Sequence, residues 1–279
     1  MKKFDELVDS GALFDSHCHL AYLPDVRVVV DQAKSHGVEA IIDVAIDIKS
    51  AEDALATGIE YPDYVFATAG LHPEFTIPSK VLYQIPWDDK RIDEELLRLE
   101  AFLGSNVGKI TMLGECGLDW YRLPSTLVSQ SMMEYKSLQI KLFEAQVDLA
   151  KQFDLPLNIH TRDSFADTFE IVRKQQGRVR GVFHSFTGGF SDAKLILDQG
   201  FFIGVNGIVT YKTAEMLREA IKSIMGRHSE VAPSDFYEKG IVFETDTPYL
   251  RPSNSIIKSD NNLPANVAKV FEYVQKLVG

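Results

Sequence analysis

Six side chains that commonly bind metal ions follow apolar, strand-like runs in this sequence. Two are only two residues apart, and the other four are spread over more than a hundred residues. They are His17, His19, Glu115, His160, His184 and Asp246. Apolar β-branched runs that finish in His, Glu or Asp are hard to explain by packing. They are readily explained by a metal cluster at one end of a parallel barrel, where enzymes of that fold carry their chemistry.

The sequence His17-Cys18-His19 is the strongest local signal. Residues two apart on a strand point to the same face, so both imidazoles can reach one ion while Cys18 faces away. The only other cysteine is Cys116. Two thiols in a chain of this length do not make a disulfide framework, and we expect both to be ordinary buried residues.

Glu115 lies near two glycines and is either a carboxylate on a surface turn or a ligand whose two oxygens bridge two ions. In the second interpretation, His17, His19 and Asp246 bind one metal, and His160 and His184 bind the other. Mixed imidazole and carboxylate ligation suits zinc, manganese, iron or nickel and is not an arrangement for magnesium alone.

Asp246 and Glu244 end the last apolar run, and only one of them is expected to face the metals. We predict that this residue is Asp246, because it is nearer the following loop, and that Glu244 is structural. Asp246 would also accept a proton from metal-bound water. Metal binding lowers the pKa of that water towards ~7 and provides a hydroxide nucleophile.

The elements that must position these side chains are eight strands, each followed by a helix. The strands are expected at 13–16, 38–46, 64–69, 110–114, 156–159, 179–183, 201–205 and 241–243. The helices are expected near 26–33, 50–59, 93–103, 135–149, 164–175, 192–199, 214–225 and 265–277, and the loop 79–91 is not assigned. Eight units without a Gly/Pro/Ser-rich linker predict a single (β/α)8 TIM barrel domain over residues 1–279. The alternative, an open doubly wound sheet, would bind its ligand at one switch point and would not explain ligands after five strands.

The 279-residue chain carries a net charge of −11, which argues against a protein that holds DNA through a basic surface. A nuclease is still compatible, because bound divalent metals supply positive charge that the sequence does not. No apolar stretch approaches the ~20 residues of a membrane span, and no secretory leader pattern is present. We therefore expect a cytoplasmic protein that does not enter a membrane.

Six motifs, in order along nearly the whole chain, resemble those of the TatD family of metal-dependent hydrolases, within the amidohydrolase-like barrels. They are FDSHCHL at 14–20, GLHPE at 70–74, GECGLDWY at 114–121, IHTR at 159–162, HSFTG at 184–188 and ETDTPYL at 244–250. The resemblance implies a deoxyribonuclease of the 3′ to 5′ exonuclease type that depends on magnesium. We accordingly expect two divalent ions per chain (Mg, Mn or Zn) and DNA, as an end or a single strand, as the substrate.

Four further residues in these motifs are candidates for contact with substrate. His72 is expected to contact a phosphate or the metal-bound water, or to stabilise the turn beside Pro73. Arg162 is expected to clamp a phosphate, with a surface salt bridge as the alternative. Asp119 and Tyr121, with Trp120, are expected to shape the pocket and offer a ring for base stacking, although aromatic core lining is also common. One departure from the family pattern is the absence of an arginine before Asn262 and Pro264.

Two other functions remain open on the sequence. The same site could hydrolyse another ester or amide bond, such as a lactone or an aminoacyl ester on tRNA, because the fold does not choose among them. The second alternative function is that of a binding protein that holds metal and catalyses no reaction, although the complete ligand set argues against it. The sequence leaves the oligomeric state open, a monomer included.

Overall fold

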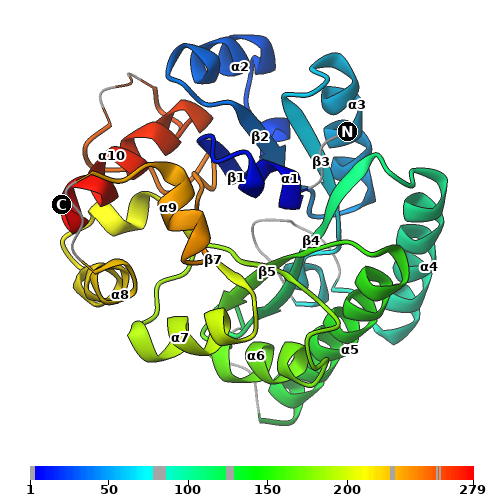
Figure 1. Ribbon diagram of the computed structural model, residues 1–279. Coiled ribbons are helices and arrows are strands. Elements are labelled where there is room, and N and C mark those ends of the chain that lie inside the picture. The colour runs from blue at the N-terminus through cyan, green and yellow to red at the C-terminus, as the bar shows by residue number, and fades with distance from the viewer. Residues whose placement is uncertain (1–3, 78–85, 124–128, 227–229, 256, 258) are drawn as a thin grey trace.

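Strands and helices alternate along the chain and form a ring of eight parallel strands surrounded by helices (Figure 1). The structure is a computed structural model that describes residues 4–77, 86–123, 129–226, 230–255, 257 and 259–279. The strands are β1 (Phe14–Cys18), β2 (Ala40–Asp43), β3 (Val65–Ala69), β4 (Ile110–Asp119), β5 (Leu157–Arg162), β6 (Gly181–Phe183), β7 (Phe202–Val205) and β8 (Ile241–Phe243). The helices are α1 (Phe4–Asp9), α2 (Val26–Ser35), α3 (Ile48–Glu60), α4 (Asp89–Ser105), α5 (Ser129–Phe153), α6 (Phe165–Arg173), α7 (Phe190–Asp198), α8 (Glu215–Met225), α9 (Pro233–Glu238) and α10 (Val267–Val278).

The strands pair in sequence order from β1 to β8, and every pairing is parallel. Main-chain hydrogen bonds join the first and last strands beyond β8: the His19 N–H donates to Thr247 O over 2.9 Å, and the Asp246 N–H donates to His17 O over 2.8 Å. The predicted (β/α)8 barrel is confirmed. Closure brings the carboxyl ends of all eight strands around one centre, as the ligand pattern required.

The opposite end of the barrel is covered by α1 (Figure 1). The Phe4 ring packs edge-on against Phe14 at 6.3 Å and against Phe202 at 5.5 Å, and these two residues begin β1 and β7. Apolar burial of this kind is the main source of stability. Because α1 covers the end where the strands begin, the accessible mouth of the barrel is at the carboxyl ends of the strands. The short helices α1 and α9 were not among the expected elements.

Helix starts follow from aspartate caps. The Asp25, Asp47 and Asp88 carboxylates accept backbone N–H groups in the first turns of α2, α3 and α4. Such caps satisfy N–H groups that lack a partner within the helix. The Asp88 cap explains why α4 begins at Asp89 rather than at the expected residue 93. Of the unassigned loop 79–91, residues 79–85 lie outside the described residues and 89–91 belong to α4.

Strands β4 and β5 are longer than expected, and this corrects the expected positions of two candidate ligands. Glu115 and His160 lie inside paired strands rather than after them. Gly117 pairs with His160 and has a φ of +143°, and a Cβ at this position would lie 2.0 Å from His160 O. Strands β4 and β5 stay paired beyond the residues where the sequence predicted their ends, because glycine permits this backbone geometry and the close approach of the His160 carbonyl.

Both cysteines are buried and free, as expected. The Cys18 thiol donates to Ile42 O at 3.6 Å, on the side away from the two flanking histidines, and the Cys116 thiol donates to Asn158 O at 3.6 Å. Within the part of the chain that the structure describes, no helix combines the length and the apolar character needed to cross a bilayer.

Candidate metal centre

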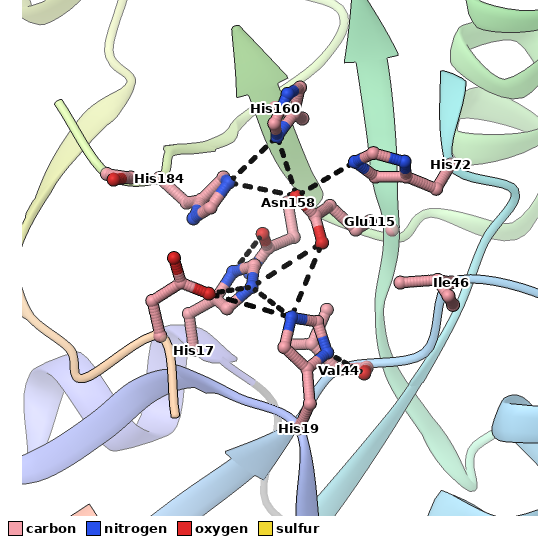
Figure 2. A network of polar contacts seen from close by, with 12 residues as sticks. His17, His19, Val44, Ile46, His72, Glu115, Asn158, His160 and His184 are labelled. Atoms are coloured by element: carbon pink, nitrogen blue, oxygen red, sulfur yellow. Dashed lines mark hydrogen bonds and ion pairs between the residues drawn. The ribbon is translucent and has the colours of Figure 1, made fainter. Parts of the chain in front are cut away.

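The Glu115 carboxylate lies at the centre of a ring of histidines at the barrel mouth (Figure 2). Its Oε1 is 2.8 Å from His160 Nδ1 and 2.9 Å from His184 Nε2. Its Oε2 faces the other way and is 3.6 Å from Nε2 of both His17 and His19. The two oxygens of one carboxylate therefore face two separate pairs of imidazoles.

Asp246 adds a second carboxylate on the side of His17 and His19. Its Oδ1 is 3.8 Å from His17 Nε2 and 3.6 Å from His19 Nε2. Glu244 points elsewhere: it is fully buried, and its Oε1 accepts the Ser185 N–H at 2.6 Å. Of the two carboxylates at the end of the last strand, Asp246 faces the cluster and Glu244 lies behind it.

Four of the histidines turn one ring nitrogen inward and the other towards an oxygen behind the ring. His17 Nδ1 lies 2.8 Å from Asn158 Oδ1, and His19 Nδ1 lies 2.7 Å from Val44 O. His160 Nε2 lies 3.1 Å from Asp119 Oδ2, and His184 Nδ1 lies 3.7 Å from Glu244 Oε1. An acceptor behind a neutral imidazole holds its proton on the outer nitrogen and leaves the inward nitrogen with a free lone pair. The hydrogen bonds thus give His17 and His19 the tautomer that a metal ligand needs. His160 has a carboxylate oxygen at each ring nitrogen, and His184 Nδ1 has no hydrogen-bond partner among the described residues.

His72 has the opposite arrangement. Its Nδ1 accepts the Glu74 N–H at 3.1 Å, and its Nε2 lies 3.5 Å from Glu115 Oε1. A neutral imidazole has one N–H, so a donor on Nδ1 places that hydrogen on Nε2, facing the cluster. Geometry alone would group His72 with Glu115 and His160 as three potential ligands. The tautomer argues that His72 presents an N–H rather than a lone pair.

The pKa values show how strongly these groups are coupled. Burial raises the pKa of Glu115, but attraction to His72 and His184 and hydrogen bonds from His160 and His184 hold it well below the ordinary value. Burial lowers the pKa of His184, yet the Glu115 carboxylate brings it well above the ordinary value. Burial and repulsion from His184 keep the pKa of His17 well below normal. An ionised carboxylate surrounded by imidazoles is an environment that attracts cations.

The residues present fit metal ions. Three groups drawn from the cluster have ligand atoms within 4.8 Å of one another: His17 with His19 and Glu115, His17 with His184 and Asp246, and the group that contains His72. The six side chains predicted from sequence as metal ligands all converge here. Inward imidazole nitrogens, a carboxylate between two imidazole pairs and a second carboxylate at one side form a donor set that suits divalent metal ions.

Two buried glutamines of α5 hold the backbone that carries His72 and Asp119. Gln146 Oε1 accepts the Leu71 N–H at 2.8 Å, and its Nε2 donates to Leu71 O at 2.9 Å. Gln139 does the same for Asp119, with 2.8 Å to the N–H and 3.3 Å to the carbonyl oxygen. Sequence reasoning missed both, because an apolar periodicity reports the buried face of a helix but not buried polar residues on it.

The predicted substrate-side residues lie in two different environments. Asp119 is fully buried, contacts His160 and accepts the Arg122 N–H at 2.9 Å. Tyr121 is 60% exposed, and the Arg162 guanidinium carbon lies 3.8 Å from the centre of its ring. Arg162 forms no ion pair with any residue that the structure describes, so its charge is available to solvent.

Arg122 was not singled out from the sequence, although it follows the aromatic pair of its motif. Its Nη1 donates to Glu74 Oε1 at 3.1 Å, and its Nε lies 3.7 Å from Asp119 Oδ2. The arginine that the family resemblance leads us to expect before Asn262 is absent from the sequence. Asn262 itself is buried, with its side-chain amide donating to Thr245 O at 2.9 Å. Arg251 donates to the carbonyl oxygens of Ile257 and Ser259 in the same region.

Comparison with known proteins agrees with this geometry. The family model described as TatD related DNase matches residues 14–279. The chain is 32% identical to the uncharacterized metal-dependent hydrolase YcfH of Escherichia coli, over 96% of this chain and 88% of that protein. It is 30% identical to the uncharacterized metal-dependent hydrolase YabD of Bacillus subtilis, over 95% of this chain and 91% of that protein.

Among solved structures, the TatD homolog YjjV from Escherichia coli superposes with a TM-score of 0.73 and 25% identity, covering 95% of this chain and 90% of that one. The matches extend over the whole barrel and include every strand that carries a candidate ligand. The chain therefore belongs to the TatD family and is a metal-dependent hydrolase.

Proposed function

We propose that this protein is a deoxyribonuclease that hydrolyses phosphodiester bonds at DNA ends, in the 3′ to 5′ direction, with two divalent metal ions. One ion would be held by His17, His19 and Asp246, the other by His160 and His184, with Glu115 between them. The observation that carries the proposal is the division of the imidazoles between the two oxygens of Glu115. Pairs of divalent metals recur in phosphatases and nucleases, and a pair held by these residues would stabilise the attacking and leaving oxygens of an in-line displacement.

Bound divalent ions would supply an activated water molecule and polarise the phosphoryl oxygen. The residues of this chain would supply the proton transfers. Asp246 is the candidate acceptor, because its carboxylate lies beside His17 and His19 and is not enclosed by the barrel core. Its side chain is 15% exposed, whereas that of His17 is fully buried. A carboxylate at the solvent edge of the cluster can take a proton and pass it to water.

His72 would donate its Nε2–H to a phosphoryl oxygen. The Glu74 N–H holds the ring in this tautomer. A hydrogen-bond donor aimed at developing negative charge stabilises a transition state in acyl and phosphoryl transfer. Replacement of His72 should therefore reduce turnover and leave the number of bound metal ions unchanged.

Arg162 and Tyr121 would bind the DNA outside the metals. The guanidinium stacked on the exposed ring combines a cation for phosphate with an aromatic face for a base. Asp119 stays a predicted site residue, but its burial against His160 favours a role in orienting that ring over contact with substrate.

The test uses metal-stripped protein and short single-stranded and duplex DNA labelled at the 5′ end. Mg, Mn or Zn is restored in turn. We expect a ladder that shortens from the 3′ end, abolished in Glu115→Ala and Asp246→Ala. Glu95→Gln is the matched control, because Glu95 is a buried carboxylate on α4 that pairs with Arg98.

Intact DNA with every metal, from protein shown to bind metal, would refute the nuclease proposal. The same protein would then be tested on lactones and on carboxylic, aminoacyl and amide substrates. Normal cleavage by purified, folded Glu115→Ala would refute the assigned centre, whatever the substrate.

A further inference from the structure

The two halves of the candidate metal centre differ in the groups that lie behind their histidines. Figure 2 shows His17 and His19 on one side of Glu115 and His160 and His184 on the other. Behind the first pair lie neutral oxygens, the amide of Asn158 and the main-chain carbonyl of Val44. Behind the second pair lie carboxylates.

The direct carboxylate ligands are distributed in the opposite way. Asp246 Oδ1 lies within 3.8 Å of both His17 and His19 Nε2. A carboxylate oxygen of Asp246 also lies within 4.8 Å of a His184 ring nitrogen, but among the described residues no carboxylate besides Glu115 lies at the inward nitrogen of His160. The half nearer Asp246 therefore has neutral oxygens behind its rings, and the half farther from Asp246 has two carboxylates behind them.

The carboxylate behind His160 is fixed by its surroundings. Asp119 Oδ2 lies 3.1 Å from His160 Nε2, and its Oδ1 accepts the Arg122 N–H at 2.9 Å. Gln139 binds both main-chain groups of Asp119 from α5. The position of this charge is set by the fold rather than by solvent.

The carboxylate behind His184 is buried with one of its oxygens lacking a hydrogen-bond partner in the described part of the chain. Glu244 Oε1 accepts the Ser185 N–H at 2.6 Å and the Asn206 amide at 3.2 Å, and lies 3.7 Å from His184 Nδ1. Neither Glu244 Oε2 nor His184 Nδ1 has a hydrogen-bond partner among the described residues. A Cβ on Gly204 would lie 2.2 Å from Oε2, so the glycine makes room for this carboxylate. Burial of a carboxylate oxygen without a partner is unfavourable, and a cation held through His184 would offset it.

We propose that Asp119 and Glu244 act through His160 and His184 to supply, to the second metal position, the negative charge that Asp246 supplies directly to the first. This inference rests on the two-metal centre of the proposed function. Asp119 lies within hydrogen-bond distance of the outer nitrogen of His160, and Glu244 lies at ion-pair distance, 3.7 Å, from the outer nitrogen of His184. A carboxylate behind a ligating imidazole makes the inward nitrogen a stronger donor, and loss of such partners commonly weakens metal binding by about 10–100-fold. Both are positioning residues, because neither faces the reacting atoms.

The test is calorimetric titration of metal-stripped protein with Mn²⁺ and with Zn²⁺, which measures the affinity of each equivalent without turnover. Co²⁺ absorption bands report the coordination of each position. In Asp119→Asn and Glu244→Gln, one equivalent should weaken by about 10–100-fold and the other should keep its affinity. The Co²⁺ bands of only one position should change. Glu95→Gln, remote from the centre, should match wild type.

A reciprocal variant tests the same idea by gain of affinity. Asn158→Asp places a carboxylate behind His17 and should strengthen the equivalent that the other variants leave unchanged. If Asp119→Asn or Glu244→Gln does not fold, Asn158→Asp still tests the inference. Uniform weakening of both equivalents, or unchanged affinities in folded variants, would overturn the inference while the two-metal centre stood. Uptake of a single metal by wild type at saturation would instead refute the two-metal centre itself.

Discussion

Replacement of Gln146 by leucine should destabilise the barrel well beyond an ordinary polar-to-apolar change. Gln146 is fully buried on α5, and its amide binds both the N–H and the carbonyl of Leu71. Leucine has a similar size but can satisfy neither group. Each buried main-chain group left without a partner costs about 1–3 kcal/mol, so the loss of two should lower the free energy of unfolding by about 2–6 kcal/mol. Because His72 follows Leu71, DNA cleavage should fall as well, with metal stoichiometry unchanged.

The assay is urea unfolding of the metal-free proteins, followed by circular dichroism, with the slope and the midpoint both measured. The matched control is Gln152→Leu on the same helix, where the glutamine is exposed and its amide donates to Glu100. A surface change of this kind should alter stability by no more than about 0.5 kcal/mol. The reasoning is wrong if Gln146→Leu loses no more stability than Gln152→Leu.

Three further predictions concern metal, pH and DNA. Metal affinity should rise with pH, because the pKa values of His160 and His184 are raised and a metal ion must displace their protons; titration at several pH values checks this. Burial raises the pKa of Asp43 to about 7, so the stability contributed by its neutral form is present below pH ~4 and lost as the pH rises through 7. Relative to Asp43→Asn, wild type should therefore lose about 4 kcal/mol over that range, and a constant difference in denaturant midpoints would contradict the assignment. Arg162→Ala should raise KM for single-stranded DNA and should reduce the magnitude of the slope of log affinity against log salt concentration by roughly 0.7. Tyr121→Leu should also raise KM. An unchanged slope for Arg162→Ala would remove Arg162 from the DNA-binding surface.

The barrel and its ligand-bearing strands could be predicted because both signals are local. Alternating apolar runs and helical periodicity mark the eight units, and a polar metal ligand at the end of an apolar strand is conspicuous. His17 and His19 could be paired from sequence alone, because alternation along a strand places residues two apart on the same face. The choice of Asp246 over Glu244 also rested on local position, and Asp246 is the one that faces the cluster.

The limits of strands β4 and β5 were harder to predict. Gly114 and Gly117 suggested a turn around Glu115, whereas the strand continues to Asp119. Glycine is read as a breaker when only its neighbours in sequence are known. Here Gly117 lies against His160 O, and that contact exists only after β4 and β5 have paired.

The sequence by itself determined the metal-ligand residue types and the order of the elements that carry them, because each depends on a pattern within a few residues. Only the tertiary structure decided which histidine presents a lone pair and which an N–H. That difference depends on what lies behind each ring: the Asn158 amide oxygen for His17, the Val44 carbonyl for His19 and the Glu74 N–H for His72. Most of these partners lie far away in the chain, and barrel closure brings them together. A hydrogen bond between distant residues leaves no periodic signal, so the role of each imidazole is set by packing rather than by its place in the sequence.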